Sequence, residues 1–247
     1  MKHLIRGVII LIGLIFLWQL VVWLTQLPGY ILPSPLAVFY SLINNASLLA
    51  HESVPTLIEI VLGFVLGSLL GIFCALFITY VKPVRMWFLP ILLISQALPT
   101  FAIAPLLVVW LGYGIAAKVV ITMIMLFFPV TSSFYDGLRA TPQIWLDLAK
   151  TMNASSWQLL WRIKVPAALP RLASGLRVAA TIAPLGALIG EWVGSSKGLG
   201  YLMINADARM QIDLMFAVLI IVTVLTLALY FAVDKALKKL ISWESVQ

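Results

Sequence analysis

Long apolar runs fill most of the chain, and short turns that carry charged residues, proline or glycine separate them. A helix that crosses a hydrocarbon core of ~30 Å needs ~20 mostly apolar residues. Six runs meet this requirement, so the pattern predicts six membrane-spanning helices, at about 7–25, 55–80, 87–110, 116–135, 172–193 and 212–233. The first run exceeds the apolar part of a usual signal peptide and no small-residue cleavage site follows it, so we expect a retained helix.

Two connections between these helices carry a pattern of their own. In the 26–54 segment Ser34 can cap a short helix that begins at Pro35, with apolar residues on one face as suits the membrane interface. The 136–171 segment is polar but patterned, so we predict a structured element here. No internal repeat divides the chain, and 1–247 is predicted to form a single transmembrane domain of the all-α class.

Composition supports the membrane assignment and removes other classes. Hydrophobic residues make up 63% of the chain and charged residues 10%, whereas a soluble domain would carry roughly 25% charged residues. The single cysteine, Cys74, excludes an intrachain disulfide and a cysteine metal cluster. The two histidines, His3 and His51, are too few and too far apart in sequence to suggest a zinc site, so we expect no bound metal.

The positive charge of the chain has a topological meaning. A net charge of +7 could suggest nucleic acid binding, but most of the 16 Lys and Arg residues fall in the two termini and in the second and fourth connections. These segments share one side of the membrane, and basic residues gather on the cytoplasmic side. We therefore predict a multi-pass protein of the bacterial inner (plasma) membrane with both termini in the cytoplasm and no nucleic acid partner.

Small residues recur every four positions along two of the predicted helices. Gly63, Gly67 and Gly71 share one face of the second helix, and Gly175 begins a similar row on the fifth. Such rows let helix backbones approach closely, which matters where lipid provides no hydrophobic drive for helix association. The pattern fits packing within the chain, a dimer contact or a moving gate.

Polar groups inside membrane spans are costly, so each one is a candidate for function. The third predicted helix contains Gln96, followed by Pro99 and Thr100, and its prolines free backbone carbonyl groups that a cavity can satisfy. The fifth helix ends with Glu191 beside Trp192. We therefore expect the third and fifth helices to line a translocation pathway through these residues.

Other interpretations of the polar side chains stay open at this point. Glu191 could be an interfacial carboxylate that reaches water or pairs with Lys197 or Arg209; otherwise it contacts a gate or the substrate. Gln96 could form an interhelical hydrogen bond with no part in transport. Glu59, near one end of the second helix, is expected to be solvated or paired.

The connection between the fourth and fifth helices contains the most informative stretch. Residues 142–152 suit a helix with Pro142 at its first position, and Asn153 tolerates the left-handed backbone that ends a helix. Ser155 or Ser156 can then cap a second helix. The pattern predicts two short helices that meet at a sharp bend.

The second of these helices would expose an apolar face. Its large apolar residues recur at helical spacing, which places two indoles and a leucine on one side. The apolar residues are Trp157, Leu160 and Trp161, and Lys164 continues the same spacing. A face of this kind rests on the lipid interface or in a groove of a partner protein, and the spacing alone favours neither.

The same stretch resembles the EAA loop of ATP-binding-cassette (ABC) importer permeases, whose pattern is Glu-Ala-Ala, Gly-Ala-Ser, Gln and Ile-x-Leu-Pro. The matching positions are Asp147, Ala149, Asn153, Ala154, Ser155, Gln158, Ile163 and Pro166. Asp147 replaces Glu, Leu148 replaces the first Ala and Asn153 replaces Gly. Aspartate keeps the charge and asparagine accepts a positive φ, so we expect the loop geometry to be kept.

The resemblance extends over nearly the whole chain. It includes segments 32–35, 175–179, 190–194 and 198–201, which look like those of permeases for nitrate, sulfonates, taurine and thiamine-pyrimidine precursors. Segments 104–114 and 190–194 look closest to permeases for the hydroxymethylpyrimidine moiety of thiamine. The resemblance implies import of such a precursor or a related heterocycle, with sulfonate, taurine or nitrate as alternatives.

The resemblance also implies an assembly. It suggests a six-helix, type I ABC importer permease fold that works as a homodimer with two cytoplasmic ABC ATPase subunits and an external or periplasmic substrate-binding protein. Trp161 and the matching loop residues would dock in a cleft of the ATPase. The chain has no G-x-x-x-x-G-K-[ST] phosphate loop, so we expect it to be no enzyme and to bind no cofactor itself, with ATP and Mg²⁺ used by the partner ATPase.

Two rival classes fit the residues less well. An ion-coupled secondary transporter would need intramembrane charges coupled to an ion and has no need of a tryptophan-faced cytoplasmic loop. A membrane-embedded enzyme would need His, Asp or Glu clustered near one membrane face, and the sequence does not supply such a cluster.

Overall fold

The chain folds almost entirely into helices. The computed structural model describes residues 2–81, 83, 86–87, 90, 92, 94 and 99–241, and no strand occurs within these ranges. A helix satisfies its own backbone hydrogen bonds, which an apolar segment in lipid requires. The predicted all-α class is therefore confirmed.

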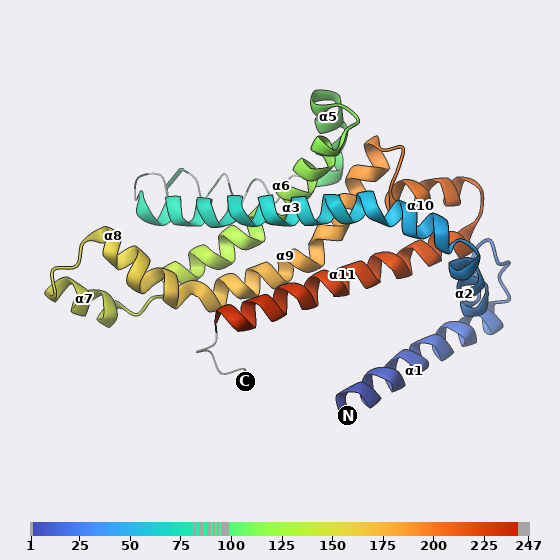
Figure 1. Ribbon diagram of the computed structural model, residues 1–247, viewed down its shortest axis with the longest axis horizontal. Helices are drawn as coiled ribbons and strands as arrows, with labels where there is room; N and C mark the ends of the chain where they lie inside the picture. The colour runs from blue at the N-terminus through green and yellow to red at the C-terminus, as the bar shows by residue number, and fades with distance from the viewer. Residues whose placement is uncertain are drawn as a thin grey trace.

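Figure 1 shows the order of the helices. The first half of the chain forms α1 (Lys2–Thr25), α2 (Pro35–Asn44), α3 (Ala46–Tyr80), α5 (Thr100–Leu111) and α6 (Ile115–Arg139). The second half forms α7 (Gln143–Thr151), α8 (Ser156–Leu159), the π-helical turn η1 (Leu160–Lys164), α9 (Val165–Gly194), α10 (Leu199–Ala208) and α11 (Ile212–Leu240).

Four helical segments of the described chain are long and apolar enough to cross a membrane. They are Ala46–Tyr80, Ile115–Arg139, Ser156–Gly194 and Ile212–Leu240. The predicted runs 55–80, 116–135, 172–193 and 212–233 lie inside them. α1 and α5 contribute shorter apolar helices, Ile9–Thr25 and Thr100–Leu111, at the places of the other two runs.

The predicted helix 87–110 is not continuous. Pro99 has an extended backbone (φ −66°, ψ 115°), and α5 begins at the next residue, Thr100. Proline has no N–H to donate, so it suits the start of a helix better than the interior. Much of this run, including Gln96, lies outside the described residues.

α9 begins earlier than the apolar pattern predicts. The N–H of Val165 donates to the carbonyl of Leu160, five residues back, so η1 joins α8 to α9 without a break. A π-helical turn bonds each N–H five residues back, and this absorbs the irregularity next to Pro166, which has no N–H. The second short helix of the predicted bend is therefore the first part of one long helix.

α6 lies between α3 and α9 and packs more closely on them than on any other described helix. A methyl group added at Gly71 of α3 would lie 2.8 Å from the carbonyl oxygen of Phe127 in α6, and one at Gly175 of α9 would lie 2.7 Å from Ser133 Cβ. Gly63 and Gly67 contact α6 with similar closeness. The glycine rows were open to three interpretations, namely packing within the chain, a dimer contact or a moving gate. The contacts with α6 support packing within the chain.

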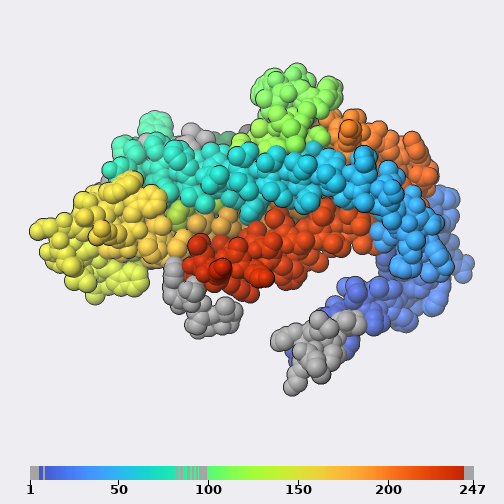
Figure 2. All heavy atoms as spheres, viewed as in Figure 1, coloured from blue at the N-terminus to red at the C-terminus, as the bar shows by residue number. Residues whose placement is uncertain are grey.

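The long helices run side by side and give the molecule two ends (Figure 1). We call the end that holds α7 and α8 the α7 end, and the opposite end, with α2 and α10, the α10 end. In Figure 2, α7 and α8 form a protrusion at the α7 end, and the N-terminal part of α1 stands away from α11. Nearer its other end, Trp18 of α1 stacks on Phe216 of α11, with ring centroids 5.4 Å apart. An apolar groove of about 930 Å³ lies among α1, α2 and α11.

Candidate functional site

At the α7 end the chain makes the predicted bend. α7 follows Pro142 and ends before Asn153, whose φ of 55° lies in the left-handed region. The N–H of Ala154 donates to the carbonyl of Ala149 at 3.0 Å and closes the turn. The left-handed conformation predicted for Asn153 is confirmed.

Ser155 and Gln158 fix the start of the next helix. The N–H of Gln158 donates to Ser155 Oγ at 3.3 Å, and the N–H of Ser155 donates to Gln158 Oε1 at 2.9 Å. This capping box satisfies two N–H groups that the first helical turn would leave without partners. Of the two serines considered, Ser155 is the cap.

Aromatic rings line one side of this bend. The Trp157 ring lies 5.9 Å from that of Tyr80, edge to face, and 5.5 Å from that of Trp161. Both indoles remain exposed, by 57% for Trp157 and 43% for Trp161. Leu160, which the spacing places on the same face, is buried instead, because the π-helical turn that begins there departs from the 3.6-residue period.

An apolar groove of about 480 Å³ lies between α7 and the start of α9. Its lining consists of Trp145, Leu148, Ala149, Met152, Arg162, Ile163, Pro166 and Ala167. Leu148, which departs from the EAA pattern, is 63% exposed at this groove. The structure thus brings Ala149, Ile163 and Pro166 together at one groove. Exposed apolar surfaces of this kind are typical of sites that contact a protein, a membrane or a ligand.

Asp147 presents a negative charge on α7. Its carboxylate accepts hydrogen bonds from Lys150 Nζ at 3.0 Å and Gln143 Nε2 at 2.9 Å. The bond from Lys150, followed by that from Gln143, lowers the pKa of this exposed carboxyl. Asp147 is therefore ionised at neutral pH, as the acidic position of the EAA pattern requires.

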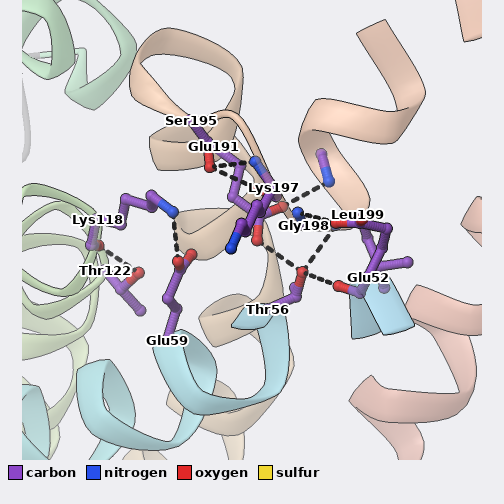
Figure 3. Close-up of polar contacts among 11 residues, drawn as sticks. Glu52, Thr56, Glu59, Lys118, Thr122, Glu191, Ser195, Lys197, Gly198 and Leu199 are labelled. Atoms are coloured by element: carbon purple, nitrogen blue, oxygen red, sulfur yellow. Dashed lines mark hydrogen bonds and ion pairs between the residues drawn. The ribbon is translucent and has the colours of Figure 1, made fainter. Parts of the chain in front are cut away.

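A second group of polar residues is buried at the α10 end, where side chains from α3, α6 and α9 converge (Figure 3). Lys118 Nζ donates to Glu59 Oε1 at 2.6 Å, and the two side chains are 8% and 1% exposed. Thr56 Oγ1 donates to Glu191 Oε1 at 2.6 Å, and Glu191 is 1% exposed. We call these four residues the polar cluster.

Glycines allow the helices to approach at this point. Gly186 and Gly190 of α9 face Thr122 and Lys118 of α6, and a methyl group at Gly190 would lie 2.9 Å from Lys118 Cα. Glu191 follows directly in the sequence, and its carboxyl group contacts Thr56 of α3 and Gly200 of α10.

Side chains of α3 and α9 hold the first turn of α10. The bonds run from the N–H groups of Gly198, Leu199 and Gly200 to Glu52 Oε2 at 2.6 Å, Thr56 Oγ1 at 2.9 Å and Glu191 Oε2 at 2.5 Å. The first N–H groups of a helix have no partner within the helix, so these oxygens stabilise its start. Gly198 has a φ of 106°, which glycine adopts without strain.

The structure corrects one interpretation of Glu191 and decides that of Glu59. Glu191 is buried and does not reach water; within the described chain its hydrogen bonds go to Thr56 and Gly200, and none goes to Lys197 or Arg209. Glu59 was expected to be either solvated or paired, and the structure shows it paired, with Lys118, and buried.

The described pathway candidates occupy two places. Pro99 and Thr100 form the start of α5, while Glu191 and the 38% exposed Trp192 stand near the end of α9. Sequence reasoning does not single out Lys118 or Thr56 as parts of a site. A signal exists for Lys118, because it lies inside the predicted span 116–135, where a charge is costly. Thr56 carries no such signal, since hydroxyl groups are common in helices.

The helix arrangement defines a class of protein. One chain of the MetNI methionine ABC transporter, solved in inward-facing conformations, aligns with a TM-score of 0.64 over 75% of this chain and 92% of that chain. The sequences are 19% identical, so the likeness establishes the fold. It is the fold of type I ABC importer permeases, and the predicted fold is confirmed.

The sequence places the chain within that class. It belongs to the family of binding-protein-dependent transport system inner membrane components, whose model matches residues 67–242. A probable ABC transporter permease protein of Haemophilus influenzae is 53% identical over 97% of this chain and 98% of that protein. The formylaminopyrimidine transport permease protein ThiX of Halalkalibacterium halodurans is 34% identical over 95% of this chain and 96% of that protein. More distant relatives are named as permeases for riboflavin, aliphatic sulfonates and taurine.

The resemblance to ABC importer permeases is therefore confirmed. The chain is a membrane-spanning permease component of an ABC importer, and the relatives are permeases and not enzymes themselves. Membership in the family implies an ATPase and a binding protein as partners.

Proposed function

We propose that this permease imports a pyrimidine precursor of thiamine or a related heterocycle. The observation that supports this substrate is the 34% identity with ThiX over nearly the full length of both chains. A relative named for riboflavin, another heterocycle, is 31% identical, whereas relatives named for aliphatic sulfonates and taurine are 28% and 26% identical. Sulfonate, taurine or nitrate import is the second candidate.

The working unit in this proposal is a homodimer with two ABC ATPase subunits and an external binding protein. The predicted six spans of one chain are few to enclose a passage, so two copies would form it together. The binding protein selects the substrate, and the ATPases use ATP and Mg²⁺, while the permease itself binds no cofactor.

The α7 end faces the cytoplasm in this proposal. Basic residues gather on the cytoplasmic side of membrane proteins. Those in and around α7, α8 and the start of α9 are Arg139, Lys150, Arg162, Lys164 and Arg171, whereas the loops at the α10 end carry Lys197 and Arg209. Both termini would then lie in the cytoplasm as well.

The groove and the indoles at the α7 end would receive the ATPase. The bend that Asn153, Ser155 and Gln158 shape leads directly into α9, and the helical segment Ser156–Gly194 continues for 39 residues, roughly 58 Å at 1.5 Å per residue. A displacement of the bend therefore moves a helix whose far end carries Glu191. One helix would link the ATPase contact to the α10 end, where the binding protein docks.

Transport by the purified assembly tests the substrate. Proteoliposomes that hold the permease, its ATPase and its binding protein should take up labelled formylaminopyrimidine when ATP is present inside and the binding protein outside. Unlabelled hydroxymethylpyrimidine should compete with this uptake, and taurine should not. A matched preparation without ATP gives the background. Uptake of taurine or an alkylsulfonate, with none of the pyrimidine, would refute the proposed substrate.

A further inference from the structure

The polar cluster holds more acidic than basic groups in a space closed to water. Glu59 and Glu191 are each 1% exposed, and Lys118 is 6% exposed (Figure 3). If all three side chains were ionised, two negative charges would share one positive charge. Burial of an uncompensated charge is strongly unfavourable, so such a group takes up or releases a proton.

The hydrogen bonds show where the imbalance lies. Glu59 Oε1 accepts from Lys118, but Glu59 Oε2 is buried and has no donor within the described chain. Both oxygens of Glu191 already accept hydrogen bonds, from Thr56 and from Gly200. In Figure 3 the carboxyl groups of Glu59 and Glu191 point into the same buried space between α3 and α9. Two ionised carboxylates so placed would repel each other and leave Glu59 Oε2 unsatisfied.

We propose that Glu59 and Glu191 form a proton-binding site, in which a proton on the Glu191 carboxyl group is donated to Glu59 Oε2. The proton comes from water and returns to water, and no other bond forms or breaks. With it, the cluster has one negative and one positive charge, and every carboxyl oxygen has a partner.

Within the described residues, other charged groups near the cluster do not supply the missing charge. Glu52, on α3, adds a further carboxylate and is bonded to His51. Lys197, in the loop before α10, is exposed. α5 contains no charged residue, α10 has Asp207 in its exposed last turn, and Asp213 of α11 lines a separate cavity beside α2. The proton is therefore the balancing charge.

The site makes the stability of the fold sensitive to pH. The native chain binds one proton that an unfolded glutamate has released at neutral pH, since its ordinary pKa is about 4.3. Above that pKa the folded state binds more protons than the unfolded state, so stability must fall as pH rises, until the site itself loses its proton. The folding equilibrium constant should then fall by up to about tenfold per pH unit.

The test compares the full-length permease with Glu191→Gln, which has the shape of the protonated acid and cannot titrate. Asp207→Asn is the matched control, because it makes the same chemical change at an exposed position of α10. Thermal unfolding in detergent is followed at intervals between about pH 6 and pH 9. Infrared spectroscopy of the folded protein reports the C=O stretch of a protonated carboxyl group, which ionised carboxylates lack.

We expect wild type and Asp207→Asn to lose stability as pH rises, and Glu191→Gln to lose markedly less stability over the same range. It also expects a protonated-carboxyl band in wild type at pH 7 that disappears reversibly at higher pH. Equal pH dependence in all three proteins would overturn it, as would a wild type without the band. If Glu191→Gln fails to fold, the wild-type band alone decides, its presence supporting the site and its absence refuting it.

Discussion

Removal of the buried ammonium group tests the energetics of the polar cluster directly. Lys118→Met keeps the unbranched, apolar stem of the side chain and removes the charge that faces Glu59 Oε1 at 2.6 Å. Glu59 is 1% exposed and cannot turn to water without opening the contact between α3 and α6. The variant must therefore either bury an unpaired carboxylate or protonate it.

Protonation sets the size of the effect. Adding a proton at pH 7 to a carboxyl group with an ordinary pKa of about 4.3 costs about 3.7 kcal/mol, at 1.36 kcal/mol per unit. This value agrees with the cost of removing one partner of a buried ion pair, which is roughly 3–5 kcal/mol. We expect Lys118→Met to lose about 3–4 kcal/mol of unfolding free energy at pH 7. The loss should shrink by about 1.4 kcal/mol for each unit of pH below 7, because the proton becomes easier to add.

A double-mutant cycle separates the pair from other effects of the substitutions. Unfolding free energies of wild type, Lys118→Met, Glu59→Gln and the double variant are measured in mixed micelles of an anionic and a mild detergent. Removal of both charges should recover at least half of the loss, with a coupling free energy of about 2 kcal/mol or more. A loss below about 1 kcal/mol for Lys118→Met would refute the reasoning, since solvated pairs contribute only that much.

Three further variants test other parts of the molecule. Trp161→Asp should insert normally but no longer co-purify with the ATPase, while the same change at Trp110, 71% exposed on α5, should leave co-purification intact. Ser155→Ala removes the capping box and should cost about 1 kcal/mol, seen as faster proteolysis at the bend; an unchanged cleavage rate would contradict the role of the cap. Gly71→Val places methyl groups against α6 and should cost at least about 1–3 kcal/mol in detergent unfolding, whereas Gly13→Val meets open space and should cost nothing measurable.

Local chemistry explains why the bend could be predicted from the sequence. Asn153, Ser155 and Gln158 act on backbone groups within a few residues of themselves, so their spacing carries the information. The apolar runs are readable for a similar reason, because the thickness of the membrane sets their length. The junction of α8 with α9 was not predictable in this way, since a π-helical turn has no residue pattern of its own.

The polar cluster depends on contacts that no local pattern encodes. Lys118 and Glu59 are 59 residues apart in sequence, and Thr56 and Glu191 are 135 apart. The charge of Lys118 inside a predicted span marks that residue alone, and only the packing of α3 and α9 on α6 brings the four side chains together. The glycine rows predicted close helix packing but not the partner helix, so they could not point to this site.

Thr122 shows what the close packing of α6 means for movement. It is in contact with Gly63 of α3 on one side and Gly186 of α9 on the other. Helices slide past each other by exchanging side-chain contacts, and at these positions there is no side chain to exchange. We therefore expect α3, α6 and α9 to travel as one rigid body during transport. Conformational change would then fall to their hinges with neighbouring elements and to the seam between two copies of the chain.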